Sequence, residues 1–158
     1  MNRFKFTFLL AAILLFSCNK EEQYSEISAE ELHASIDQVT NIMVHDIFSP
    51  PVASRIYAYA NVAAYEIVAL SNPNYNSLAG QLNGLESIPK PKQTSKVNYR
   101  MSALIAHIEI SQNLIFSEDK MIQYKDSLYS NWRETNPLEF ENSRAYATEV
   151  VDHIKSWM

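Results

Sequence analysis

Glycine is unusually scarce in this sequence, with two copies in 158 residues, against a usual share of about 7%. A chain with so little glycine has few places for the loops that cradle phosphate groups, and it is predicted to be mostly helical. Because 47% of the residues are hydrophobic and 20% are charged, the chain is too apolar for intrinsic disorder. The composition therefore predicts a globular, all-α protein.

Charge and cysteine content exclude several classes of function. The formal net charge is −5, whereas a protein that binds nucleic acid needs a basic surface to neutralise phosphates. The single cysteine cannot form an internal disulfide, a Cys-x-x-Cys pair or a zinc-finger site. We therefore expect no nucleic-acid partner and no disulfide framework.

The first 17 residues have the features of a signal peptide. Arg3 and Lys5 precede an apolar run over 6–16, which is shorter than the roughly 20 residues of a spanning helix. The run ends in Leu15-Phe16-Ser17-Cys18, which resembles a bacterial lipobox, so Cys18 is the predicted lipidation site and the predicted first residue of the mature chain. The alternative is an ordinary secretory signal with a cysteine near its cleavage site by chance.

Residues 18–27 are predicted to be the acylated cysteine and a polar tether. The tether begins with the sequence NKEE, which resembles the surface-export signals of Bacteroidetes lipoproteins. We therefore expect a lipoprotein of the cell envelope, held in the outer membrane by its lipid and exposed at the cell surface if that signal is read.

Five helices and one long loop are predicted over 28–158. Ser28 and Glu31 form a capping box for the first helix, which ends near Asp46 before two prolines. The other helices are predicted at about 51–71, at 95–116, after Ser117 as N-cap, and after Asn136 as N-cap. The loop over 72–93 contains both glycines, and its leucines and Ile88 are expected to pack onto the helices.

The helix at about 51–71 is apolar on nearly all its faces, which is typical of a helix in the centre of an assembly. Arg55 and Glu66 share one stripe of this helix but lie three turns apart, so they cannot pair with each other. We expect Arg55, Glu66 and Asp46 to be buried polar residues with structural roles.

The last predicted helix has no stop signal before Met158. Its apolar residues remain in phase to the end, without a glycine, a proline or a polar tail. Because a natural terminus rarely exposes such a face, the pattern leads us to expect that the chain is cut off and that the region 28–158 is incomplete.

Neither a metal centre nor a nucleophilic site can be built from the motifs present. A carboxylate-bridged diiron bundle needs two Glu-x-x-His motifs, and Glu30-x-x-His33 is the only match among four histidines, the others being His45, His107 and His153. His45 and Asp46 precede Ser49, but neighbours in sequence do not converge as a catalytic triad does. Solvated or singly hydrogen-bonded histidines are the default expectation.

Three stretches resemble a known family. They are HDIFSPPVASRIYAYANVAAYE at 45–66, SLAGQLNGL at 77–85 and FSED at 116–119. Together they resemble the N-terminal helical region of bacterial vanadium-dependent haloperoxidase-like proteins, in the type 2 phosphatidic acid phosphatase superfamily. The resemblance covers roughly 28–158. It implies an all-helical fold in which vanadate or phosphate is held by lysine, arginines, a glycine amide and two histidines.

None of the family's anion-binding elements can be carried over to this chain. There is no Arg-Pro dipeptide, and neither Gly80 nor Gly84 is followed by histidine. After Ser54-Arg55 the required histidine position holds Asn61, and after Ser143-Arg144 it holds Val150. We therefore expect no catalytic, cofactor-binding or metal-binding residue here, and vanadate only where a downstream half is present.

Two functions follow from these patterns. The first is an inactive, membrane-anchored fragment of a haloperoxidase or phosphatase, with the missing C-terminal half as its partner; the residues do not distinguish halide oxidation from phosphate-ester hydrolysis. The second is a free-standing helical lipoprotein that acts as a binding or scaffold module.

Overall fold

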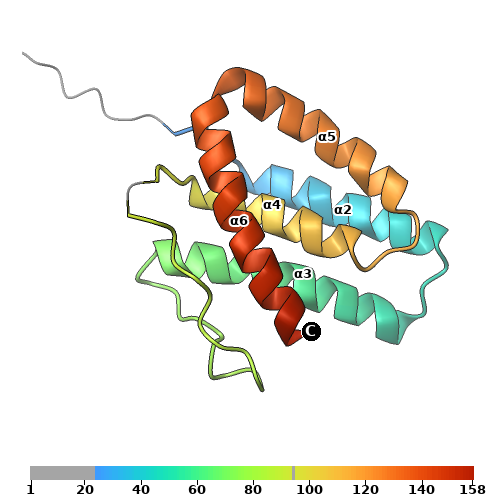
Figure 1. Cartoon of the computed structure of the whole chain (residues 1–158). Coiled ribbons are helices and arrows are strands. Elements are labelled where there is room, and N and C mark those ends of the chain that lie inside the picture. The colour runs from blue at the N-terminus through green and yellow to red at the C-terminus, as the bar shows by residue number, and fades with distance from the viewer. Residues whose placement is uncertain (1–23, 94) are drawn as a thin grey trace, which may run out of the picture.

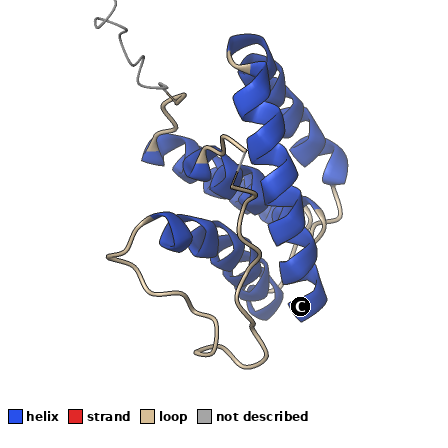
Figure 2. Cartoon of the chain, turned by 60° about the vertical axis from the view of Figure 1, so that its left-hand side comes forward, coloured by secondary structure: helices blue, strands red, loops and turns tan. Residues whose placement is uncertain are grey.

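The computed structural model describes residues 24–93 and 95–158, and every regular element in them is a helix (Figures 1 and 2). The helices are α2 (Ala29–His45), α3 (Pro50–Ser71), α4 (Tyr99–Gln112), α5 (Glu118–Thr135) and α6 (Pro137–Trp157). The predicted all-α fold with five helices is confirmed. The predicted signal peptide and Cys18 lie outside the described residues. None of the described helices is long and apolar enough to cross a membrane.

Local signals place most of the helix ends. The Ser28 and Glu31 side chains form the predicted capping box at the start of α2. The predicted third helix is shorter than expected, because the Asn98 side chain accepts from the Met101 amide and starts α4 there. Asn136 precedes α6 as predicted, but its side chain makes no capping bond.

Helix α4 is the centre of the fold. All four other helices pack against it, and α3 has the largest contact with it. Ten of its 14 residues are buried: Met101, Ser102, Ala103, Leu104, Ile105, Ala106, His107, Ile108, Ile110 and Ser111. Within the described residues α3, which was expected in the middle of a larger helical assembly, lies at one side of the bundle and leaves Val52 44% exposed. Its alanines, Ala60, Ala63 and Ala64, are buried and line the face that packs close to its neighbours.

The long loop between α3 and α4 packs onto the helices, as predicted. Leu85 and Ile88 are buried, and Leu78 and Leu82 lie partly buried against the core. Gly84 has a φ of +77°, and a Cβ built on it would lie 3.7 Å from the Trp157 side chain. Since L residues rarely adopt that conformation, glycine suits this close turn.

The apolar face of α6 is covered, which differs from the exposed face expected from the sequence. Val150, Val151 and Ile154 are buried. Trp157 packs edge-on to Tyr59 of α3 with ring centroids 5.4 Å apart, and its indole donates to the Asn83 carbonyl. Helices α3 and α4 and the long loop supply this cover, and the sequence pattern alone could not reveal it.

Candidate functional site

Glu66 is a buried carboxylate in α3 that fixes the start of the long loop. Glu66 is 2% exposed. One oxygen accepts from the Ser77 hydroxyl and the other from the Leu78 amide, both at 2.6 Å. Hydrogen bonds from neutral donors thus satisfy the charge, and Glu66 joins α3 to the segment that follows it.

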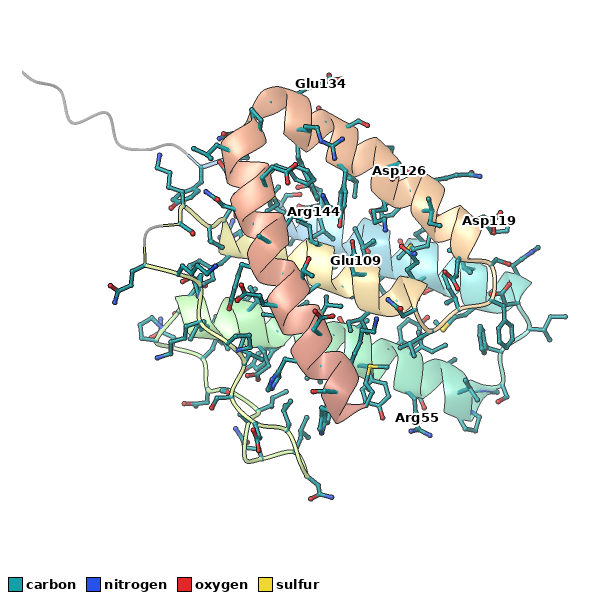
Figure 3. All side chains as sticks on the ribbon, viewed as in Figure 1. Arg55, Glu109, Asp119, Asp126, Glu134 and Arg144 are labelled. Atoms are coloured by element: carbon teal, nitrogen blue, oxygen red, sulfur yellow. The ribbon has the colours of Figure 1, made fainter. Side chains whose placement is uncertain are left out.

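Arg55 lies on the outside of α3, so the expectation of a buried arginine is wrong. Figure 3 shows its side chain at the outer edge of that helix, away from Glu109 and Arg144. Its guanidinium donates to the Tyr59 hydroxyl at 3.3 Å and lies 5.9 Å from the centre of that ring. Helix α3 has 22 residues and α4 has 14, so α4 cannot cover every turn of α3.

Asp46 is half-buried and joins the two connections at one end of the bundle. Its carboxylate accepts from the amides of Phe116 and Ser117, each at 2.9 Å, and from the Ser117 hydroxyl. Partial desolvation raises the pKa of the Asp46 carboxyl, but these hydrogen bonds outweigh it and hold that pKa below its ordinary value. Ser117 was expected to cap α5, and its hydroxyl is instead committed to Asp46.

A second buried carboxylate, Glu139, was not singled out from the sequence. It is 4% exposed at the start of α6. Its oxygens accept from the Ser25 amide at 3.0 and 3.1 Å and from the side-chain amides of Asn98 and Asn136, each at 2.6 Å. Its place in the first turn after Asn136-Pro137 is a local signal for such a role. The Ser25 amide and the Asn98 side chain lie far from Glu139 in the sequence, so no local pattern indicates that they donate to it.

His107 forms a buried pair with Ser35 of α2. The ring is 1% exposed, and Nδ1 shares a hydrogen bond of 2.9 Å with the Ser35 hydroxyl. Burial lowers the pKa of His107 from its ordinary value of 6.5 to about 4, so the ring is neutral near pH 7. Ser35 is itself fully buried, so no substrate reaches this pair from solvent.

The charged residues of the described chain do not converge on one point. Lys125 lies 3.6 Å from Glu109, while the ion pairs of Glu141 with Arg133 and Arg144 are exposed and 3.9 Å long. Figure 3 shows Glu109 and Arg144 near the crossing of α4 and α6, with Asp119, Asp126 and Glu134 spread along α5. Over residues 24–93 and 95–158, no three His, Cys, Asp or Glu side chains are grouped so as to hold a metal ion.

An apolar groove of about 290 Å³ lies between α2, α3 and α4. Leu32, Val68 and Leu104 line it, with Arg100 at its edge. Arg100 donates to the Ile27 carbonyl at 3.4 Å. The groove combines apolar walls with one cation, and the Ser28 hydroxyl that also lines it serves as the N-cap acceptor of α2.

Glu66→Ala should lower the free energy of unfolding by about 2–3 kcal/mol, because the Ser77 hydroxyl and the Leu78 amide lose their shared acceptor. Urea unfolding followed by circular dichroism measures the change. The control is Glu86→Ala in the same loop, whose side chain is exposed. Equal losses in the two variants would show that Glu66 does not anchor the loop.

The chain was compared with known proteins. No family model and no curated protein matches it. A solved crystal structure, described as the first bacterial vanadium-dependent iodoperoxidase, matches with 61% sequence identity and a TM-score of 0.85. The match covers 87% of this chain and 33% of that one, so this chain spans about a third of the length of the enzyme. The predicted resemblance to bacterial vanadium-dependent haloperoxidase-like proteins is confirmed as a similarity, and the matched part of this chain has the same helical fold as about one third of that iodoperoxidase.

Proposed function

We propose that this chain forms a non-catalytic, helical part of a vanadium-dependent haloperoxidase-like protein and does not carry the anion site itself. The similarity to the iodoperoxidase, at 61% identity, is the observation that supports it most directly. The carboxylates Asp46, Glu66 and Glu139 also support it, because each accepts hydrogen bonds that join separate segments of the fold. The role of these residues is structural.

The reaction proposed for the complete protein is peroxide-dependent oxidation of iodide, following the described activity of the similar enzyme. The sequence contains no Arg-Pro dipeptide and no Gly-His dipeptide. The residues that would hold vanadate by positive charge and hydrogen-bond donors are therefore assigned to polypeptide outside this chain.

A peroxidase assay tests this assignment. The purified full chain, mixed with vanadate, hydrogen peroxide and iodide, should form triiodide no faster than buffer does. The similar iodoperoxidase is the positive control under the same conditions. Turnover by this chain that depends on added vanadate would contradict the proposal.

A free-standing helical lipoprotein that serves as a binding module is the second candidate. The covered face of α6 favours it, since Val150 and Ile154 are fully buried without any further polypeptide. This candidate predicts a single sharp thermal transition and a monodisperse monomer, measured by calorimetry and sedimentation. An aggregated sample or a higher oligomer in sedimentation would contradict this candidate.

We also propose that lipid on Cys18 anchors the chain in the cell envelope. Several acyl chains, each contributing about 0.8 kcal/mol for every buried CH₂ group, make such an anchor effectively permanent. Cys18→Ala should move the protein from the membrane fraction to the soluble fraction and abolish incorporation of labelled palmitate. Lys20→Ala, two residues further on, is the control and should leave both unchanged. A Cys18→Ala protein that stays in the membrane would refute the anchor.

A further inference from the structure

Three large apolar side chains at one end of the bundle are the most exposed of their kind in the described residues. Ile47 is 88% exposed, Phe116 is 77% exposed and Val44 is 73% exposed. Val44 and Ile47 belong to the end of α2 and the connection to α3, and Phe116 belongs to the connection between α4 and α5. Together with Phe48, these residues are called the connection surface below.

Long-range contacts hold the two connections side by side (Figure 1). The Phe48 and Phe116 rings stack with centroids 4.6 Å apart. Asp46 accepts from the amides of Phe116 and Ser117. The apolar side chains therefore stand on a fixed backbone, and an incoming partner would meet a pre-organised surface.

Ile47 also has an unfavourable backbone conformation. Its φ is +58°, in the left-handed region where β-branched residues are rare. Its amide donates to the Val44 carbonyl and the Phe48 amide donates to the Met43 carbonyl, which is the Schellman pattern that closes a helix. Glycine is the usual residue at the position of Ile47. Ile47 thus combines an unfavourable backbone conformation with a side chain that is 88% exposed.

The similarity to the iodoperoxidase supports one choice of occupant for this surface. This chain matches 33% of that enzyme's chain, so two thirds of the enzyme lie outside the match. An exposed apolar surface on a fixed backbone is well suited to pack against such additional polypeptide. A second copy of this chain is the alternative occupant, and the sedimentation measurement below distinguishes it.

We propose that the connection surface is the site where the remaining polypeptide of a vanadium-iodoperoxidase-like protein packs, through an apolar face that buries Ile47 and Phe116. This rests on the proposed function, in which the anion site belongs to that other polypeptide. Burial of the Ile47 side chain against that polypeptide would offset the backbone strain at this residue.

Thermal unfolding of two intact proteins tests the proposal. In this chain, Ile47→Gly should raise Tm by about 2–4 °C, because it removes the left-handed strain and little buried contact. In the intact iodoperoxidase, glycine in place of the residue aligned with Ile47 should lower Tm, because the proposal buries that side chain in the complete protein. Leu138→Gly, on an exposed residue at the start of α6, is the control and should shift Tm in the same direction in both proteins.

Opposite signs for Ile47→Gly in the two proteins support the proposal, and equal signs overturn it. A dimer of this chain in sedimentation that Ile47→Asp makes monomeric would also overturn it, since a second copy would then be the occupant. Both measurements are independent of enzyme activity. Failure of the iodide assay therefore bears on the proposed function alone, and failure of the Tm test bears on the docking surface alone.

Discussion

Glu139→Ala is expected to lower the free energy of unfolding by about 3 kcal/mol, one of the largest effects of any single polar substitution in this chain. The carboxylate is 4% exposed and is the shared acceptor for Ser25, Asn98 and Asn136. Its removal leaves the Asn98 side-chain amide buried with only the Ser25 carbonyl as acceptor. Urea unfolding of the variant and the wild type measures the difference.

Glu141→Ala is the matched control on the same helix. Its carboxylate is 56% exposed and lies 3.9 Å from both Arg133 and Arg144. Because water screens such exposed ion pairs, the free energy of unfolding of Glu141→Ala should differ from that of the wild type by no more than about 0.5 kcal/mol. A loss of less than about 1 kcal/mol for Glu139→Ala would show that water replaces the carboxylate and that this cluster does not hold the N-terminal segment to α4 and α6.

Acidification is expected to destabilise the fold through His107. The folded protein binds a proton on this ring only near pH 4, because burial lowers its pKa to about 4 from 6.5. The unfolded chain binds that proton near pH 6.5, so between these values the unfolded state holds more protons and stability falls as pH falls. The full shift corresponds to about 3 kcal/mol, present above pH 6.5 and lost progressively as the pH approaches 4.

Urea unfolding at several pH values between 7 and 4 measures this dependence. In His107→Gln the fall in stability over that window should become much smaller, whereas His33→Gln, at an exposed position, should leave it unchanged. The pKa of Asp46 is lowered from 3.8, so its contribution is lost only as the pH falls below about that value. An unchanged pH dependence in His107→Gln would mean that another group causes it.

Helix positions could be predicted well because their signals are local. The Ser28 and Glu31 capping box and the prolines at the starts of α3 and α6 act within one turn of the chain. The shorter α4 shows the limit of this approach, since residues 95–97 fit a helical pattern but precede the cap at Asn98.

The burial of individual polar residues was harder to predict. The sequence marks Glu66 and Arg55 alike, as charged residues on one stripe of an apolar helix, yet Glu66 is buried and Arg55 is exposed. Which turn of α3 is covered depends on the length and position of α4. Glu139 was missed because its partners Ser25 and Asn98 are 114 and 41 positions away in the chain.

The sequence by itself determined the helical class, most helix ends and the resemblance to vanadium-dependent haloperoxidases. These depend on glycine content, on apolar spacing and on hydrogen bonds that close within about four residues. Only the tertiary structure decided that α4 is the central helix, which carboxylates join distant segments, and that Ile47 and Phe116 form one exposed surface. Burial and long-range hydrogen bonds depend on which surfaces meet, and spacing along one helix does not specify its neighbours.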